Sequence, residues 1–245
     1  MHYKAYAKVN IFLKIVGTRG NYHELVSRFM IVPSLFDTLS FVPKKSKEAF
    51  ELVGDFNCAL EHNTLYRTFM VLKSHGFAKE VERVMGMYAL QVSKNIPTGS
   101  GLGGGSSDSA TFLKMLNDVG NLGLSLEEMM KLGSEVGADV PFFASGYESA
   151  NVSGIGEIVE KYDEAALDLE VFTPPLACNT AMVYKTYREY FLQSMDQALA
   201  SKMVTLKSSE LLSQFSKEEL NDLFPACLKA YPELGNYAKE GWFFS

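Results

Sequence analysis

Polar and apolar residues alternate at the start of the chain. Between Tyr3 and Val16 the period is two, which places successive side chains on opposite faces of a strand. One face carries Tyr3, Ala5, Ala7, Val9, Ile11, Leu13 and Ile15, and the other carries Lys4, Tyr6, Lys8, Asn10, Phe12 and Lys14. Lys8 and Asn10 therefore share a face. That face is either a solvated surface or a site where an ammonium and an amide group meet a ligand.

Five further segments show the alternation or the short apolar runs that are typical of strands. They cover residues 22–30, 35–42 and 88–93, a strand with a glycine turn over 150–159, and a segment ending at Pro174-Pro175. The basic run at 44–47 is expected to be a solvated loop. The pattern changes after Gly146, so a domain boundary is expected near residue 148.

Apolar residues at helical spacing predict six helices. The first follows an Asn63 cap and ends at Gly76, and the second uses Ser106 or Ser107 as its N-cap. The others cover 126–136 with a capping box of Ser125 and Glu128, a helix opening at Asn179, residues 208–214, and residues 216–231 with a capping box of Ser216 and Glu219 and a kink at Pro225.

Composition narrows the class of protein without defining it. The 245 residues are 47% hydrophobic and 21% charged, as expected for a globular enzyme. A net charge of −6 argues against a general nucleic-acid binder, which would normally carry a basic face. Cys58, Cys178 and Cys227 show no metal-ligand spacing, so reduced thiols in a cytoplasm are expected. The longest apolar run, over 29–36, is too short to cross a membrane.

A glycine-rich segment lies between the strand at 88–93 and the following helix. Five of the seven residues from 99 to 105 are glycine, the residue that adopts positive φ without steric cost. A strand, a glycine loop and a helix N-terminus together favour phosphate binding, although a purely structural turn has the same composition. The segment lacks the Lys-Ser/Thr of a Walker loop. No acidic residue ends a second strand at the spacing that dinucleotide sites use, because a new helix is expected to begin there, at Ser125.

A second chemical segment reads Gly137-Ala138-Asp139-Val140-Pro141-Phe142-Phe143. It places Asp139 between small and apolar residues after the predicted helix at 126–136. A carboxylate in such surroundings requires a partner. Asp139 is therefore either a structural helix cap or a reactive group.

The glycine segment, Pro97-x-Gly99-x-Gly101-Leu102-Gly103-Gly104-Gly105-Ser106-Ser107, resembles the central motif of the GHMP kinases, which phosphorylate small-molecule hydroxyls with ATP. The segments at 7–13, 22–23 and 137–141 resemble one branch of this family, which acts on a cytidine diphosphate-linked polyol in non-mevalonate isoprenoid synthesis. Asn21 stands where that branch usually has glycine, and asparagine tolerates the left-handed backbone of such a turn.

The resemblance implies a fold as well as an activity. It implies a two-domain α+β architecture, with an ATP-binding domain at 1–148 similar to domain 2 of ribosomal protein S5. A ferredoxin-like domain is implied at 149–245. Gly241 to Ser245 resembles the strand that enters a third family motif. We therefore expect the chain to lack its last segment, with residues through Phe244 paired in a sheet and Ser245 at the mouth of the active cleft.

Site residues follow from the same resemblance. Asp139 is expected to accept or orient the hydroxyl proton, and Lys8 to keep that carboxylate ionised and stabilise developing charge. The expected ATP contacts are Asn63, Leu65, Lys94, Pro97, Gly99, Gly101, Leu102, Gly103, Gly104, Gly105, Ser106 and Ser107. The expected contacts of the cytidine-linked substrate are Asn10, Tyr22, His23, Thr180 and Tyr184.

Several of these residues have ordinary structural explanations that remain open. Asn63, Leu65 and Lys94 also fit a helix cap, a core residue and a surface lysine. The stripe of Tyr184, Tyr187 and Phe191 also fits core packing.

The expected reaction transfers the γ-phosphoryl of ATP to the 2-hydroxyl of a cytidine diphosphate-linked methylerythritol. Mg²⁺ is expected because charge neutralisation dominates phosphoryl transfer, but the sequence identifies no metal ligand. The alternatives are another GHMP kinase, acting on homoserine, a mevalonate derivative or a sugar, or an inert nucleotide-binding module. We expect no nucleic-acid partner and no membrane partner, and the sequence does not predict an oligomeric state.

Overall fold

The computed structural model describes residues 2–176, 178–237, 239 and 242–245. Gly241, where the predicted C-terminal strand begins, lies outside these residues. The chain divides into two compact units. The first consists of Met1–Ala7, Pro33–Thr98 and Gly103–Gly146, and the second of Lys8–Val32, Gly99–Leu102 and Tyr147–Ser245. Lys8–Val32 and Gly99–Leu102 group with the second unit, although both precede the domain boundary expected near residue 148.

Two long strands contribute residues to both units. β1 covers His2–Arg19 and β2 covers Tyr22–Pro43, so the single strand β2 replaces the two predicted at 22–30 and 35–42. Proline cannot donate to a strand ladder. Pro33 is accommodated because it lies between Leu25–Met30, which pairs with β5, and Thr38–Pro43, which pairs with β4.

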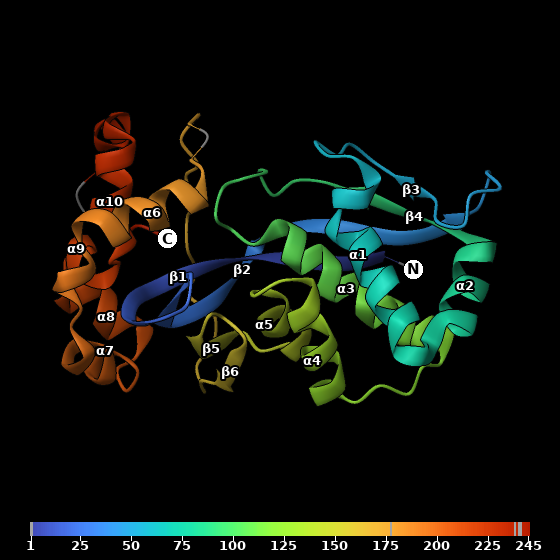
Figure 1. The fold of residues 1–245 in the computed structure, drawn as a ribbon, viewed down its shortest axis with the longest axis horizontal. Coiled ribbons are helices and arrows are strands. Elements are labelled where there is room, and N and C mark those ends of the chain that lie inside the picture. Colours follow the sequence, from blue (N-terminus) through green and yellow to red (C-terminus); the bar gives the residue numbers. More distant parts are fainter. Residues whose placement is uncertain (1, 177, 238, 240–241) are drawn as a thin grey trace. The chain divides into compact units, whose positions relative to one another are not determined.

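The first unit packs helices on the sheet formed by β2, β3 (Leu52–Val53) and β4 (Tyr88–Ser93). Its helices are α1 (Thr64–Leu72), α2 (Ala78–Met87), α3 (Gly104–Gly120), α4 (Leu126–Val136) and α5 (Val140–Ser145), all labelled in Figure 1. Its core includes the fully buried Phe69, Phe112, Leu72 and Leu116. Apolar burial of this kind is the main stabilising contribution to such a unit.

Sequence patterns predicted some of these boundaries and not others. The strand at 88–93, the helix at 126–136 and its Ser125–Glu128 capping box are confirmed. The predicted N-cap of α3 is wrong, because Gly103 at φ +71° occupies that position and Ser107 lies inside the first turns. Helix α2 was not predicted; it follows the turn Lys73–Phe77, in which Gly76 has φ +93°.

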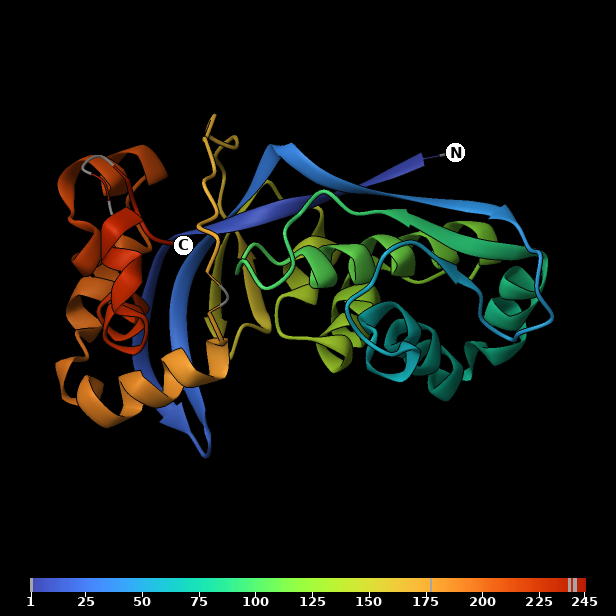
Figure 2. The same ribbon diagram turned by 90° about the horizontal axis from the view of Figure 1, so that it is seen from above.

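The second unit combines most of β1, the first half of β2 and two further strands with five helices among its described residues. β5 (Ser149–Gly154) pairs with β2 and with β6 (Ile158–Lys161). The helices are α6 (Thr180–Tyr190), α7 (Gln197–Met203), α8 (Ser208–Gln214), α9 (Lys217–Leu220) and α10 (Leu223–Ala230), coloured orange to red in Figure 2. Short 3₁₀ turns cover Leu60–His62, Leu192–Ser194 and Pro232–Tyr237.

Three predictions for the second unit are wrong. Residues 162–176, all of them described, form no strand before Pro174-Pro175. The predicted single helix at 216–231 divides at Asn221–Asp222, and Pro225 lies in the first turn of α10. The break occurs because Asp222 leaves the helix to bind β1: its amide donates to Leu13 O at 2.9 Å and its carboxylate accepts from Ile15 N at 2.8 Å. Residues 242–245, the described part of the predicted C-terminal strand, are not in a strand either.

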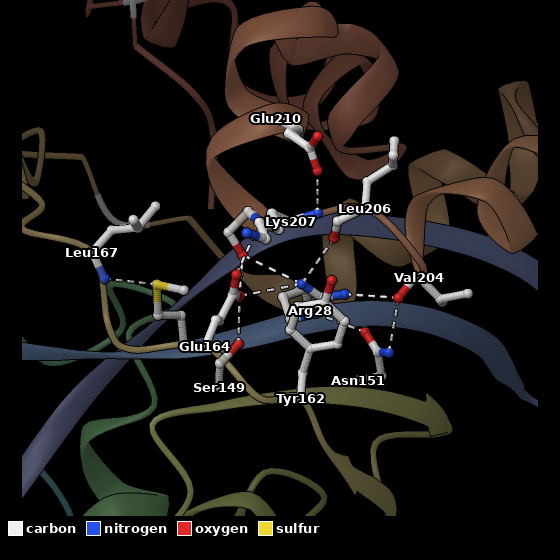
Figure 3. Close-up of polar contacts among 12 residues, drawn as sticks. Arg28, Ser149, Asn151, Tyr162, Glu164, Leu167, Val204, Leu206, Lys207 and Glu210 are labelled. Atoms are coloured by element: carbon white, nitrogen blue, oxygen red, sulfur yellow. Dashed lines mark hydrogen bonds and ion pairs between the residues drawn. The ribbon is translucent and has the colours of Figure 1, made fainter.

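A buried arginine organises the centre of the second unit (Figure 3). The Arg28 side chain is fully buried and donates to Asn151 Oδ1 at 2.7 Å, to Glu164 Oε1 at 3.2 Å and to Val204 O at 2.9 Å. Its guanidinium carbon lies 3.3 Å from the centre of the Tyr162 ring. This network attaches residues 162–164 and the end of α7 to β2 through side chains, which explains the ordered position of a segment without a strand ladder.

Candidate active site

The glycine loop connects β4 to α3 through a series of left-handed residues. Gly99, Gly101 and Gly103 have φ values of +72°, +77° and +71°, a region that other residues adopt only with strain. The loop ends at the N-terminus of α3, a helix of 17 residues. Free backbone N–H groups at such a helix end favour an anion. The geometry therefore fits the phosphate-binding loop expected from the sequence.

The other residues of the loop are divided between surface and interior. Pro97, Gly99, Gly101 and Gly105 are exposed, Gly103, Gly104 and Ser106 are half-buried, and Leu102 and Ser107 are buried. The Thr64 hydroxyl donates to Gly105 O at 3.0 Å, which attaches the start of α1 to the start of α3.

Lys94, at the entrance of this loop, is not a simple surface lysine. Its Nζ donates to Asp108 Oδ2 at 2.7 Å and also to Asp37 Oδ2. Asp37 is fully buried on β2, and Asp108 is 3% exposed in the second turn of α3. The sequence analysis missed both carboxylates as site residues, although Asp108 directly follows the glycine motif.

The pKa of Asp108 is unusually high for an aspartate carboxyl group. Burial raises the pKa of Asp108 to about 7, even though the Lys94 ammonium acts in the opposite direction. The pKa of Lys94 is also raised: burial lowers it, but the ion pairs with Asp108 and Asp37 outweigh that effect. The second oxygen of Asp108, Oδ1, is buried without a hydrogen-bond partner in the described part of the chain.

Asn63 and Leu65, expected near adenine, have clear structural roles. The Asn63 side chain caps α1 by accepting from Leu65 N at 2.9 Å. Leu65 is 1% exposed and belongs to the core of the first unit. The contact of either residue with a nucleotide remains a prediction.

Lys8 and Asn10 meet on β1 in the second unit. Lys8 Nζ donates to Asn10 Oδ1 at 2.7 Å and lies 4.6 Å from the centre of the Phe29 ring. The side chains are 5% and 7% exposed, so their face of the strand is not a solvated surface. The Lys8 amide donates to Leu102 O at 3.0 Å, which attaches β1 to the glycine loop beside the lysine. The backbone amide of Asn10 donates to Ser245 Oγ at 2.7 Å.

Asp139 belongs to the first unit, at the N-cap position of α5. In the described structure its carboxylate accepts no capping hydrogen bond from a backbone amide of that helix. Val140 N instead donates to Gly137 O at 3.1 Å. The structural-cap interpretation of Asp139 is therefore not supported.

Of the predicted cytidine residues, the structure brings His23 and Tyr184 into contact in the second unit. The His23 ring is 7% exposed and stacks on Tyr184 with centroids 5.2 Å apart. Tyr187 meets the imidazole edge-on at 5.8 Å. Burial lowers the pKa of His23, and the positive charge of Arg188 lowers it further. Tyr22 is 64% exposed, and Thr180 is the exposed first residue of α6.

This region contains polar atoms that lack partners within the described residues. They are His23 Nε2, the Tyr187 hydroxyl and one terminal nitrogen of Arg188. A buried donor or acceptor without a partner costs about 1–3 kcal/mol, so these atoms are available to bond with a ligand or with water. Arg188 was not predicted from the sequence, although it follows Tyr184 by one helical turn.

The described residues form neither a metal-binding cluster nor a membrane-spanning helix. No cluster of three or more His, Cys, Asp or Glu side chains there could hold a metal ion. No described helix has both the length and the apolar character needed to cross a membrane.

Comparison with known proteins first identifies the broad family to which the chain is similar. Residues 63–147 match the family model of the GHMP kinases N terminal domain. The fold is shared with a mevalonate kinase of Methanococcus jannaschii, at a TM-score of 0.56 and 15% identity over 96% of this chain and 79% of that one.

The similarity to one branch is much higher. A 4-diphosphocytidyl-2-C-methyl-D-erythritol kinase of Sulfurimonas denitrificans is 55% identical over 99% of this chain and 92% of its own length. One from Campylobacter jejuni subsp. doylei is 41% identical, over 99% and 95%. A crystal structure of a 4-(cytidine 5'-diphospho)-2C-methyl-D-erythritol kinase matches with a TM-score of 0.70 and 29% identity, over 97% of this chain and 81% of that one. The chain belongs to the 4-diphosphocytidyl-2-C-methyl-D-erythritol kinase family of GHMP kinases.

Proposed function

We propose that the protein transfers the γ-phosphoryl group of ATP to the 2-hydroxyl of 4-diphosphocytidyl-2-C-methyl-D-erythritol, in the synthesis of isoprenoid precursors. The observation that carries this proposal is the 55% identity to a kinase of that name over 99% of the chain. The glycine loop and the buried Lys8–Asn10 pair support it, since both are where the family motifs predict chemistry.

ATP binding is assigned to the glycine loop. Its exposed glycines and the N-terminus of α3 would receive the phosphates through backbone amides. Lys94 would order the loop, with Asn63 and Leu65 bordering the adenine. Mg²⁺ would neutralise charge on the phosphates, and because the described residues offer no acidic cluster, we expect the nucleotide itself to supply most ligands.

Phosphoryl transfer requires an activated hydroxyl group. Asp139 would accept or orient the hydroxyl proton, and Lys8 would stabilise the charge that develops during transfer. The Asn10 side chain supports this role for Lys8, because its oxygen holds the ammonium in one orientation at 2.7 Å.

The cytidine part of the substrate is assigned to the region around His23. Stacking on Tyr184 and Tyr22, with Thr180 at the start of α6, would hold the base. Neutral His23, favoured by its lowered pKa, and the Arg188 guanidinium would pair with polar atoms of the cytidine diphosphate. The unpartnered nitrogens of both residues support this assignment. Three free cysteines support a cytoplasmic location.

A turnover screen tests the proposal. ATP consumption is measured with the cytidine-linked substrate, homoserine, mevalonate, phosphomevalonate and galactose, and the phosphorylated product is located by ³¹P NMR. Turnover is expected with the cytidine-linked substrate alone. Turnover with one of the other alcohols, or none with any of them, would overturn the assignment.

A further inference from the structure

Three charged side chains of the first unit join the two ends of the glycine loop. We call Asp37, Lys94 and Asp108 the Lys94 cluster. Asp37 lies on β2, Lys94 follows β4 at the entrance of the loop, and Asp108 lies on α3 beyond its exit. The ammonium of Lys94 bridges the two carboxylates.

The entrance of the loop is held by Asp37. Its Oδ1 accepts from the backbone amides of Asn95 at 2.5 Å and Ile96 at 2.8 Å. Its Oδ2 accepts from Lys94. A fully buried carboxylate with three donors forms charge-assisted bonds, which are stronger than neutral ones. The backbone at the entrance therefore has little freedom.

The exit of the loop is held by Asp108 and by the Thr64 hydroxyl that donates to Gly105 O. A Cβ atom added to Gly104 would lie 3.0 Å from Ile96 Cγ2 and 3.5 Å from Lys94 Nζ, so the two ends of the loop are in close contact. The Asp108–Lys94 ion pair is the charged attachment between them. Asp108 also retains one buried oxygen without a partner in the described residues, so its anion is only partly compensated.

We infer that Asp108 is a positioning residue for nucleotide binding: as an anion it holds α3 to Lys94 and keeps the glycine loop at the width that receives the phosphates of ATP. This inference rests on the proposed function only in its choice of ATP as ligand. The charged groups that face Asp108 are Lys94 and Asp37. Protonation of Asp108 removes the ion pair at the exit, while the bonds of Asp37 at the entrance remain.

The raised pKa of Asp108 adds a pH dependence to this inference. Because burial raises the pKa of Asp108 to about 7, its anion is lost as the pH falls through neutrality. ATP affinity is then expected to weaken over the same range.

The test replaces Asp108 by asparagine, which preserves the shape but has no charge to lose. Asp118→Asn is the matched control, because Asp118 is an exposed carboxylate on the same helix. The dissociation constant of Mg·ATP is measured without the alcohol substrate, and the KM values of both substrates are measured, from about pH 6 to about pH 8.5, a range that spans the ordinary histidine pKa.

At high pH, Asp108→Asn is expected to weaken ATP binding about tenfold, the size of one lost charge-assisted bond. The KM of the alcohol substrate should stay within about twofold, far below that loss. Towards about pH 6 the ratio between variant and parent should fall to one, since the parent then also lacks the charge. Titration of ATP itself is common to all three proteins and cancels in this ratio.

Lys94→Gln provides a second variant, which removes the same bridge from the other side. Circular dichroism confirms that each protein is folded. An ATP affinity of Asp108→Asn equal to that of Asp118→Asn at high pH would overturn the inference, as would equal losses for both substrates at every pH. A parent that binds ATP but fails to phosphorylate the cytidine-linked substrate would refute the proposed function alone.

Discussion

Replacing Arg28 by methionine is expected to destabilise the second unit strongly. Methionine retains most of the apolar volume but removes the donors that bind Asn151, Glu164 and Val204. Arg28 is 0% exposed and Glu164 is 14% exposed, so the remaining carboxylate would lose its counter-charge in a largely buried position.

The magnitude follows from what remains around Glu164. Removing one partner of a buried ion pair typically costs about 3–5 kcal/mol. Glu164 keeps bonds from the hydroxyls of Ser149 and Ser208 and from the Ser208 amide, and Val204 O keeps a bond from Asn151 Nδ2 at 3.1 Å. The loss should therefore lie near the lower end, at about 3 kcal/mol.

Urea unfolding measures this loss. The single tryptophan, Trp242, packs edge-on against Phe172 at 5.5 Å in the second unit, so its fluorescence reports on that unit, and circular dichroism follows the whole chain. Arg19→Met is the matched control, because the Arg19 side chain is 53% exposed and its ion pairs should contribute little.

The double variant Arg28→Met/Glu164→Gln should regain part of the lost stability, since the uncompensated charge is gone. The pKa of Glu164 is lowered, because its hydrogen bonds from Ser208 and Ser149 and the charge of Arg28 outweigh burial. Its contribution is therefore present above its ordinary pKa and disappears as the pH falls through the lowered one. A loss below about 1 kcal/mol, the range of an exposed pair, would refute the reasoning.

Three further predictions concern activity. Asp139→Asn should lower the rate of phosphoryl transfer by about 10²–10⁴-fold with ATP affinity unchanged; parent-like turnover would make Asp139 structural. His23→Ala should raise the KM of the cytidine-linked substrate and leave that of ATP intact, and the reverse pattern would reassign this region. Arg188→Met should weaken binding of cytidine diphosphate by calorimetry, whereas the exposed Lys185→Met on the same helix should not; equal effects would exclude a specific contact.

The sequence pattern correctly predicted elements that are determined by residues close together in the chain. The strand at 88–93 and the helix at 126–136 were located because their periodicity and capping residues lie within a few positions of one another. The N-cap of α3 was misplaced because serine is normally the better cap. Here the left-handed backbone of Gly103 already begins the helix.

The sequence pattern could not predict contacts between residues that are far apart in the chain. Asp37 meets Lys94 across 57 positions, and no periodicity in one sequence indicates such a pairing. The segment at 162–176 has the apolar residues of a strand, yet Tyr162 and Glu164 are held by the side chain of Arg28 instead of a ladder. Lys8 and Asn10 could be placed on one face of a strand. Their burial, however, depends on residues elsewhere in the chain, such as Phe29 beside Lys8 and Ser245 beside Asn10.

The interleaved order of the two units limits how the protein can be divided. A fragment ending at Gly146 would contain every segment of the first unit, but it would also carry Leu25–Met30 without the β5 strand that pairs with these residues. Unpaired strand edges are sites of intermolecular association. During synthesis, this part of β2 therefore gains its β5 neighbour only after Ser149–Gly154 has been added to the chain.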